Sequence, residues 1–300
     1  MPIAGRKKRS SKLPVLLVAP ALVLLALFTF GPAGYALYLS LMKLHVSGGL
    51  LGTSSSQVFA GLSNYSSTFS DPEFWHSLVR MLIIAGIGVP ATVLMATLFA
   101  LCLDANATRL TTVTRLAIFL PYAVPGVIAS MLWGFLYLPA TSPIGGSTIN
   151  YFGNRLIFFT VANVAVWGVV GFNTVVLYTT LRALPRDILQ AAEIDGASER
   201  QIALRIKLPQ IAPAIAMITL FSVIGALQLF NEPTTLKPLT NAITSTWVPL
   251  MRVYSDAFIN NNIYGGAASA FSLLVMTVAF TVGGGAVATR LIRRDRKSVV

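Results

Sequence analysis

The sequence predicts an all-α membrane protein with six transmembrane helices and a polar helix–turn–helix between the fourth and fifth of them. Three observations support this fold class. The chain has 300 residues, of which 55% are hydrophobic and only 11% charged, with a mean hydropathy of +0.74. Soluble domains carry about 25% charged residues. Its apolar residues fall into six long runs, and most of its basic residues gather at the ends of these runs. The net charge of +12 therefore indicates a membrane environment rather than nucleic acid.

Six uncharged runs each reach the roughly 20 residues that a helix needs to cross the hydrocarbon core of a bilayer. Prolines inside them should kink the helices rather than forbid them, since neighbouring helices can satisfy the freed carbonyls. The first run is longer than the apolar core of about 7–15 residues in a signal peptide, which favours an uncleaved helix. We expect one transmembrane domain over 1–300, with spans at about 13–42, 78–103, 114–138, 156–181, 209–231 and 267–289.

The distribution of basic residues predicts the orientation of these spans. With the amino terminus inside, 17 of the 22 Lys and Arg residues lie in inner segments, and five lie in outer ones. Inner segments of membrane proteins are enriched in Lys and Arg. We therefore expect a multi-pass protein of the plasma (cytoplasmic) membrane with both termini in the cytoplasm. The three outer segments, 43–74, 139–155 and 232–266, read as surface loops rich in small polar residues, Gly and Pro.

The sequence contains no motif typical of catalysis, metal binding or ATP hydrolysis. Cys102 is the single cysteine, and His45 and His76 are far apart, so we expect no metal site. No G-x-x-x-x-G-K-[ST] motif occurs, so energy from ATP would have to come from partner chains. None of the ten acidic residues lies deep inside a span, which disfavours a proton- or sodium-driven carrier. We therefore expect that this chain is not an enzyme and binds no cofactor.

The polar segment 184–209 separates the fourth and fifth apolar runs and faces the inside. Ile188, Leu189 and Ala192 give its first half one apolar face, and Gly196 can end that helix in a left-handed conformation. Ser198 followed by Gln201 matches a capping box, which predicts a second short helix. An apolar face held in water can be a docking surface. It can equally be an amphipathic helix on the bilayer surface, and the residues alone leave both readings open.

This segment resembles the cytoplasmic coupling motif of ABC-transporter permease subunits. That motif reads EAA, three residues, Gly, nine residues, Ile, any residue and Leu-Pro. Here Gln190 stands in place of the usual Glu, and Ala203 in place of a Phe common in sugar permeases. Glu193 lies one turn further on and can partly substitute. The resemblance implies an ATPase-coupling role for Gln190, Ala191, Ala192, Glu193, Asp195, Gly196, Ala197, Ile206, Leu208 and Pro209.

Shorter matches extend the resemblance to the carbohydrate-uptake branch of these permeases, which includes maltose and glycerol-phosphate systems. They are 120–122 (LPY), the region of Trp133, 166–173 (VWGVVGFN), 227–233 (LQLFNEP) and 254–258 (YSDAF). The family implies a second permease subunit, and we expect it to be a different chain, so that the two form a heterodimer. It also implies two ATP-binding subunits that use ATP and Mg, and an extracytoplasmic solute-binding protein. Membrane lipid is the remaining partner, and no nucleic acid is expected.

A few polar and aromatic side chains inside the spans are candidates for the solute path, because polar groups in hydrocarbon usually face a bundle interior. Gln228 and Asn231 are placed on one face of the fifth helix near its outer end, with Glu232 at its rim. The alternative for each residue is hydrogen bonding between helices or a place in the aromatic belt. The complete candidate set is Trp133, Tyr137, Trp167, Asn173, Gln228, Asn231 and Glu232.

We therefore expect a permease subunit of a binding-protein-dependent ABC importer for a sugar or oligosaccharide. The scarcity of basic residues in the spans favours a neutral solute. Three alternatives stay open: an ion-driven secondary carrier, a membrane scaffold without transport activity and, within the ABC class, an importer of glycerol phosphate or its phosphodiesters.

Overall fold

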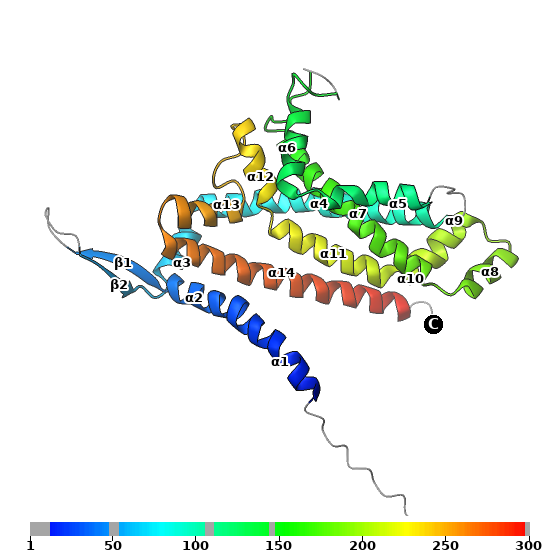
Figure 1. Ribbon diagram of the computed structural model, residues 1–300, viewed down its shortest axis with the longest axis horizontal. Helices are drawn as coiled ribbons and strands as arrows, with labels where there is room; N and C mark the ends of the chain where they lie inside the picture. The colour runs from blue at the N-terminus through cyan, green and yellow to red at the C-terminus, as the bar shows by residue number, and fades with distance from the viewer. Residues whose placement is uncertain (1–12, 48–53, 106–110, 144–147, 298–300) are drawn as a thin grey trace, which may run out of the picture.

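The computed structural model describes residues 13–47, 54–105, 111–143 and 148–297, which fold mainly as helices (Figure 1). The basic stretch 6–12 and Arg109, which contribute to the predicted orientation, lie outside these residues. The elements in chain order are α1 (Leu13–Leu25), the π-helical η1 (Ala26–Phe30), α2 (Gly31–Ser40), β1 (Met42–Ser47), β2 (Ser54–Phe59), α3 (Ser63–Ser70), α4 (Pro72–Asp104), α5 (Thr111–Phe119), the 3₁₀ turn η2 (Leu120–Ala123), α6 (Gly126–Tyr137), α7 (Ile157–Arg182), α8 (Arg186–Ile194), α9 (Glu199–Gln201), the π-helical η4 (Ile202–Lys207), α10 (Leu208–Gln210), α11 (Ala212–Leu227), α12 (Asn231–Leu236), the 3₁₀ turn η5 (Lys237–Leu239), α13 (Pro249–Tyr254), the π-helical η6 (Ser255–Ile259) and α14 (Ile263–Lys297).

The predicted all-α membrane fold is confirmed by the number and length of the apolar helices. In the described part of the chain, four helices are long and apolar enough to cross a membrane, or six if two bent pairs each count as one span. The first, second, fourth and sixth predicted spans correspond to α1–α2, α4, α7 and α14. The third predicted span is a bent pair, broken where the sequence predicts one kinked helix. The fifth corresponds to α11, which ends at Leu227 rather than at Asn231 and meets the preceding segment 199–210 at a bend.

The third span changes direction by 99° between α5 and α6. Its two prolines explain the break, since Pro121 and Pro125 each remove a backbone donor. The residue before Pro125, Val124, is extended with ψ 126°, and Pro125 itself is the N-cap of α6 with ψ 134°. Pro90 in α4 behaves differently, because α4 continues through it as one helix. A single proline is accommodated, whereas two prolines four residues apart end the helix.

The outer segment 43–74 is more ordered than the predicted surface loop. Strands β1 and β2 pair antiparallel in the register Met42 to Phe59, and α3 follows them. The first span consequently ends at Ser40 rather than at Met42. The Asn64 amide donates 2.8 Å hydrogen bonds to the carbonyls of Ser40 and Met42, which joins α3 to the start of the hairpin.

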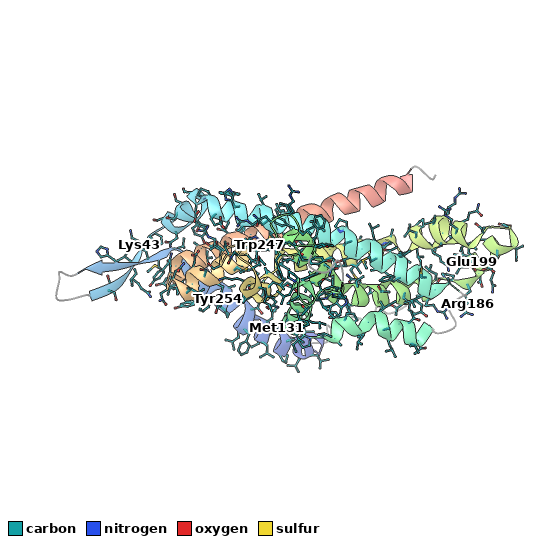
Figure 2. All side chains as sticks on the ribbon, turned by 90° about the horizontal axis from the view of Figure 1, so that it is seen from above. Lys43, Met131, Arg186, Glu199, Trp247 and Tyr254 are labelled. Carbon is teal, nitrogen blue, oxygen red and sulfur yellow. The ribbon has the colours of Figure 1, made fainter. Side chains whose placement is uncertain are left out.

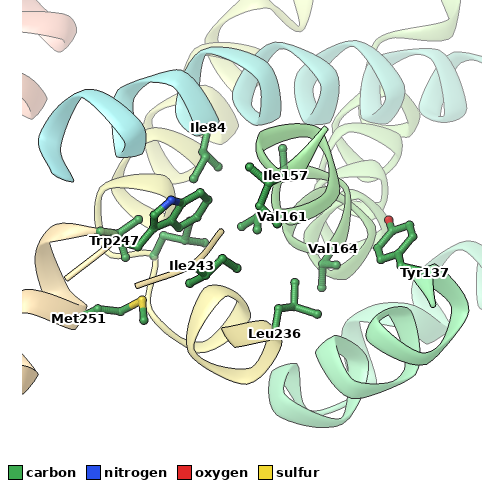
Figure 3. Packing of buried hydrophobic residues seen from close by; sticks show 12 residues of the cluster. Ile84, Tyr137, Ile157, Val161, Val164, Leu236, Ile243, Trp247 and Met251 are labelled. Carbon is green, nitrogen blue, oxygen red and sulfur yellow. The ribbon is translucent and has the colours of Figure 1, made fainter. Parts of the chain in front are cut away.

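Buried clusters lie between α4, α7 and α11, and between α4, α7 and the segments that follow α11. One cluster gathers around Val161 of α7, with Ile84 from α4, Leu236 from α12 and Trp247 and Met251 from the region of α13 (Figure 3). Helices α4 and α7 pack closely beside one another, and a Cβ added at Gly88 of α4 would lie 3.8 Å from the Val166 side chain of α7. Small residues allow such close helix packing in membranes. This pair of long helices therefore forms the centre of the subunit.

Candidate functional site

The first half of the helix–turn–helix forms as its sequence predicts. Helix α8 begins after Pro185 and ends at Ile194, and Gly196 has a φ of +79°. The Gly196 N–H donates to the Glu193 carbonyl at 3.0 Å, and the Ala197 N–H donates to the Ala192 carbonyl at 2.9 Å. These two bonds make a Schellman motif, which requires the left-handed residue. The predicted left-handed Gly196 is confirmed.

The second half begins with the predicted capping box. The Gln201 N–H donates to Ser198 Oγ at 3.4 Å, and the Ser198 N–H donates to Gln201 Oε1 at 2.8 Å. From there α9, η4 and α10 continue as one helical segment to Gln210. This segment meets α11 at an angle of 65°. The capping box therefore sets the start of a short helix that is bent by 65° relative to the fifth span.

Side chains of the helix–turn–helix are largely open to solvent. Ile188 is 45% exposed and Ile194 is 87% exposed, although both are large and apolar. Ile194 was not among the predicted coupling residues, because it lies between two acidic residues and off the predicted apolar face. Of the predicted set, the more exposed members are Gln190, Ala191, Glu193, Asp195, Gly196 and Pro209, and the half-buried ones are Ala192, Ala197, Ile206 and Leu208.

This segment lies at one end of the long axis of the molecule. Figure 2 shows Arg186 and Glu199 at the end opposite Lys43 of the β-hairpin. An open cavity of about 640 Å³ separates the segment from the ends of α4 and α7. Gln190 and Glu193 line it from α8, and Asp104 lines it from α4. The polar segment therefore encloses a water-accessible space against the spanning helices.

A second cavity of about 370 Å³ lies between α4, α7 and α11. Four of the predicted pathway residues line it, namely Asn173, Gln228, Asn231 and Glu232. The predicted single helix face is wrong, because α11 ends at Leu227 and Gln228 is its C-cap. Asn231 begins the next helix, α12. The end of the helix, rather than its periodicity, brings these side chains to the same cavity.

Trp133, Tyr137 and Trp167 do not line this cavity. The rings of Trp133 and Tyr137 stack with centroids 5.4 Å apart, and Trp133 meets Trp167 edge-on at 6.0 Å. The Asn163 amide donates to the Tyr137 hydroxyl at 2.7 Å. Figure 3 shows Tyr137 at the margin of the buried cluster around Val161. These contacts favour the packing role that the sequence left open for the three aromatic residues.

Aromatic residues outside the predicted set line the cavity instead. Tyr122 stacks on Phe172 with centroids 4.9 Å apart and an interplanar angle of 23°. Tyr122 belongs to the LPY match and reaches the cavity because the chain breaks at η2. Gly171 allows this approach, since a Cβ there would lie 2.1 Å from the carbonyl oxygen of Ile118. In the sequence, the two prolines Pro121 and Pro125 and the glycine Gly171 within the VWGVVGFN match could have indicated this close approach.

The cavity has an unusual charge distribution. Among its described lining residues, Glu232 is the only ionisable acid or base other than the phenol of Tyr122. Burial raises the pKa of the Glu232 carboxyl above its usual value, and its own backbone N–H partly offsets that effect. Asn173 donates to Ser222 Oγ at 3.4 Å, so amide and hydroxyl groups make up the rest of the polar lining. The described residues contain no group of three or more His, Cys, Asp or Glu placed to hold a metal.

Comparison with known proteins identifies the family. The family described as "Binding-protein-dependent transport system inner membrane component" matches residues 57–296. The chain belongs to this family. It is accordingly an inner-membrane component of a transport system that depends on a binding protein.

Named relatives of this membrane component differ in their solutes. It is 30% identical to the sn-glycerol-3-phosphate transport system permease protein UgpA of Agrobacterium fabrum, over 90% of this chain and 92% of that one. It is 29% identical to the trehalose transport system permease protein SugA of Mycobacterium tuberculosis, over 90% and 86% of the two chains. A solved bacterial ABC transporter involved in import of alginate has the same fold, with a TM-score of 0.73, 17% identity and coverage of 93% and 95%.

Proposed function

We propose that this permease is one of two transmembrane subunits, from different chains, of an ABC importer for a neutral sugar or oligosaccharide. An extracytoplasmic binding protein delivers the solute, and two partner subunits bind and hydrolyse ATP with Mg. This chain holds no nucleotide and catalyses no reaction. Both termini and the helix–turn–helix face the cytoplasm.

The observation that carries this proposal is the helix–turn–helix with its exposed apolar side chains. Ile188 and Ile194 are held in water by a helix whose end is fixed by the Schellman motif and the capping box. Exposed apolar groups on an ordered polar element are typical of a docking surface. In this subunit the partner would be an ATP-binding subunit, and ATP-driven closure would move the segment.

The cavity between α4, α7 and α11 supports a sugar as the solute. We call it the outer cavity, because it lies at the end of α11 away from the helix–turn–helix. Tyr122 and Phe172 offer aromatic faces, and Asn173 and Gln228 offer amides that can hydrogen-bond to hydroxyl groups. Ligand sites commonly combine apolar walls with a few such polar groups. Mechanistically, closure of the ATPases would shift the spans between inward-open and outward-open states. A ligand or nucleotide shifts that equilibrium only through different affinities for the two states.

Glycerol phosphate is the second candidate, because UgpA transports it and is 30% identical to this chain. A phosphate dianion requires basic or strongly donating groups. The described lining residues contain no Lys or Arg that could bind such an anion. The charge of the cavity therefore favours the neutral solute.

A substitution series at Gly196 tests the coupling role. A Cβ at this position would meet nothing within 4 Å, so a new side chain acts through backbone conformation and not through a clash. Val disfavours positive φ strongly, whereas Asn tolerates it. In proteoliposomes containing the whole transporter, we expect Gly196→Val to lower solute uptake at least about tenfold while ATP hydrolysis persists, in the range of typical coupling energies. Gly196→Asn should retain most uptake, and wild-type uptake by both variants would contradict the coupling role.

A further inference from the structure

A half-buried ion pair joins the helix–turn–helix to the C-terminal end of α4. Lys207 Nζ lies 2.6 Å from Asp104 Oδ2, although the residues are 103 positions apart. The side chains are 17% and 8% exposed. Lys207 is the last residue of η4, and Asp104 is the last residue of α4. The contact therefore joins η4 to the end of α4 at the wall of the cavity of about 640 Å³ beside the helix–turn–helix.

Partial burial distinguishes this contact from an exposed ion pair. Charged side chains that are mostly withdrawn from water lose part of their hydration, which a well-placed partner replaces, so separating the pair is unfavourable. The other basic residues of the helix–turn–helix, Arg186, Arg200 and Arg205, are exposed. Exposed ion pairs contribute little in comparison. Of these four basic side chains, Lys207 is thus the one whose position is tied to a spanning helix.

Helix α4 connects this contact to the outer cavity. It runs for 33 residues without a break, which corresponds to a length of about 50 Å. Its middle lines the outer cavity with Ile84, Gly88 and Thr92. At its outer end, the N-cap residue Asp71 is paired with Arg252 of α13 at 2.7 Å. One continuous helix therefore has the helix–turn–helix at one end and the wall of the outer cavity along its middle.

The direct connection through the chain changes direction, whereas α4 continues as one helix. The segment 199–210 meets α11 with a bend of 65°, at a place where Ile211 has non-helical φ and ψ of −89° and 2°. Pro209 and Pro213 flank that position and cannot donate backbone hydrogen bonds. The covalent path into α11 therefore passes through a bend, whereas the path along α4 follows one continuous helix to the outer cavity.

We propose that the Lys207–Asp104 ion pair transmits movement of the helix–turn–helix to α4 and so to the wall of the outer cavity. Both are positioning residues, because they act through α4 and do not touch the solute. This inference rests on the proposed ATP-coupled transport. Movement of the helix–turn–helix would then reach the spanning helices by two routes, through the ion pair into α4 and through the chain into α11.

The test uses the whole transporter in proteoliposomes with its binding protein. The variants are Asp104→Asn, Lys207→Gln and the exchanged pair Asp104→Lys with Lys207→Asp. The readout is the number of ATP molecules hydrolysed per solute taken up, measured on equal amounts of assembled complex. We expect each single variant to raise this ratio about tenfold, which lies within the usual range of coupling between sites. The exchanged pair should return the ratio to within about threefold of wild type, since it restores opposite charges.

Arg205→Gln is the matched control, because Arg205 is an exposed basic residue of the same segment. It should leave the ratio unchanged. Three results would overturn the inference: single variants with a wild-type ratio, an exchanged pair that assembles fully without recovering the ratio, or variants that merely assemble less while the assembled complexes keep the normal ratio. If Gly196→Val uncouples transport and Asp104→Asn does not, only this inference fails. If Gly196→Val also has no effect, the proposed coupling function fails with it.

Discussion

The helix–turn–helix and the outer cavity differ in how they arise from the sequence. The helix–turn–helix is built from contacts within a few residues, such as the capping box between Ser198 and Gln201 and the Schellman bonds around Gly196. The cavity is built from α4, α7, α11 and the break at η2, which come from distant parts of the chain. Local contacts leave a pattern in the sequence, whereas convergence of distant elements does not.

This difference explains which predictions succeeded. Each apolar run had a recognisable length and charge boundary, so the membrane fold could be predicted from composition. Gly196 and Ser198 could be predicted because turn and cap geometries require particular residue types. Gln228 and Asn231 reach the cavity at a helix end that apolar periodicity did not reveal. Tyr122 could not be placed at all without knowing that the third span turns by 99°.

The largest expected effect tests whether the cavity depends on close approach of distant backbones. Gly171→Ala places a Cβ 2.1 Å from the Ile118 carbonyl oxygen, where only the backbone could move. Over-packing of this kind typically costs about 1–3 kcal/mol. We expect a lower thermal midpoint of the purified complex and loss of solute binding. Gly168→Ala, with open space around its Cβ, is the control in the same helix. Equal midpoints for the two variants would show that the approach is not tight.

The next effect separates cavity residues from packing residues. Gln228→Leu should raise the KM of uptake about three- to tenfold, because a solute hydrogen bond contributes about 0.5–1.5 kcal/mol. Its effect on the thermal midpoint should be small, since Gln228 is exposed. Tyr137→Phe should do the reverse, as it removes the 2.7 Å bond from Asn163 and costs about 1 kcal/mol of stability without changing KM. If Gln228→Leu lowered the thermal midpoint and Tyr137→Phe raised the KM instead, Tyr137 would be the solute contact and Gln228 the packing residue.

A smaller effect concerns the local structure of the helix–turn–helix. Ser198→Ala removes the cap and should destabilise the start of α9 by about 1 kcal/mol. Amide hydrogen exchange over 199–202 should become faster, whereas exchange in α4 should not change. Gln201→Glu is the control, because Glu also completes a capping box. Faster exchange in α4 as well would mean that the segment is not a local unit.

The smallest expected effect is a change in how the thermal midpoint depends on pH. Burial raises the pKa of Glu232 above its usual 4.5, so the folded protein holds this proton more tightly than the unfolded chain does. Stability from this group is complete below the unfolded pKa and is lost as pH rises through the raised folded value. Relative to Glu232→Gln, the wild type should therefore lose stability on raising the pH above about 4.5. Parallel curves of thermal midpoint against pH for the two proteins would exclude an uncompensated carboxylate in the cavity.

Photo-crosslinking from position 194 tests most directly whether the helix–turn–helix receives its movement from an ATPase. Ile194 is 87% exposed in α8, so a benzophenone amino acid can replace it without disturbing the core. Phe59, which is 73% exposed in β2 at the opposite end, is the matched control. In the purified, reconstituted transporter, we expect a crosslink from position 194 to the ATP-binding subunit, with a yield that changes on adding nucleotide, and none from position 59. A probe at 194 that reaches only lipid or the extracytoplasmic binding protein would show that the helix–turn–helix does not dock on an ATPase.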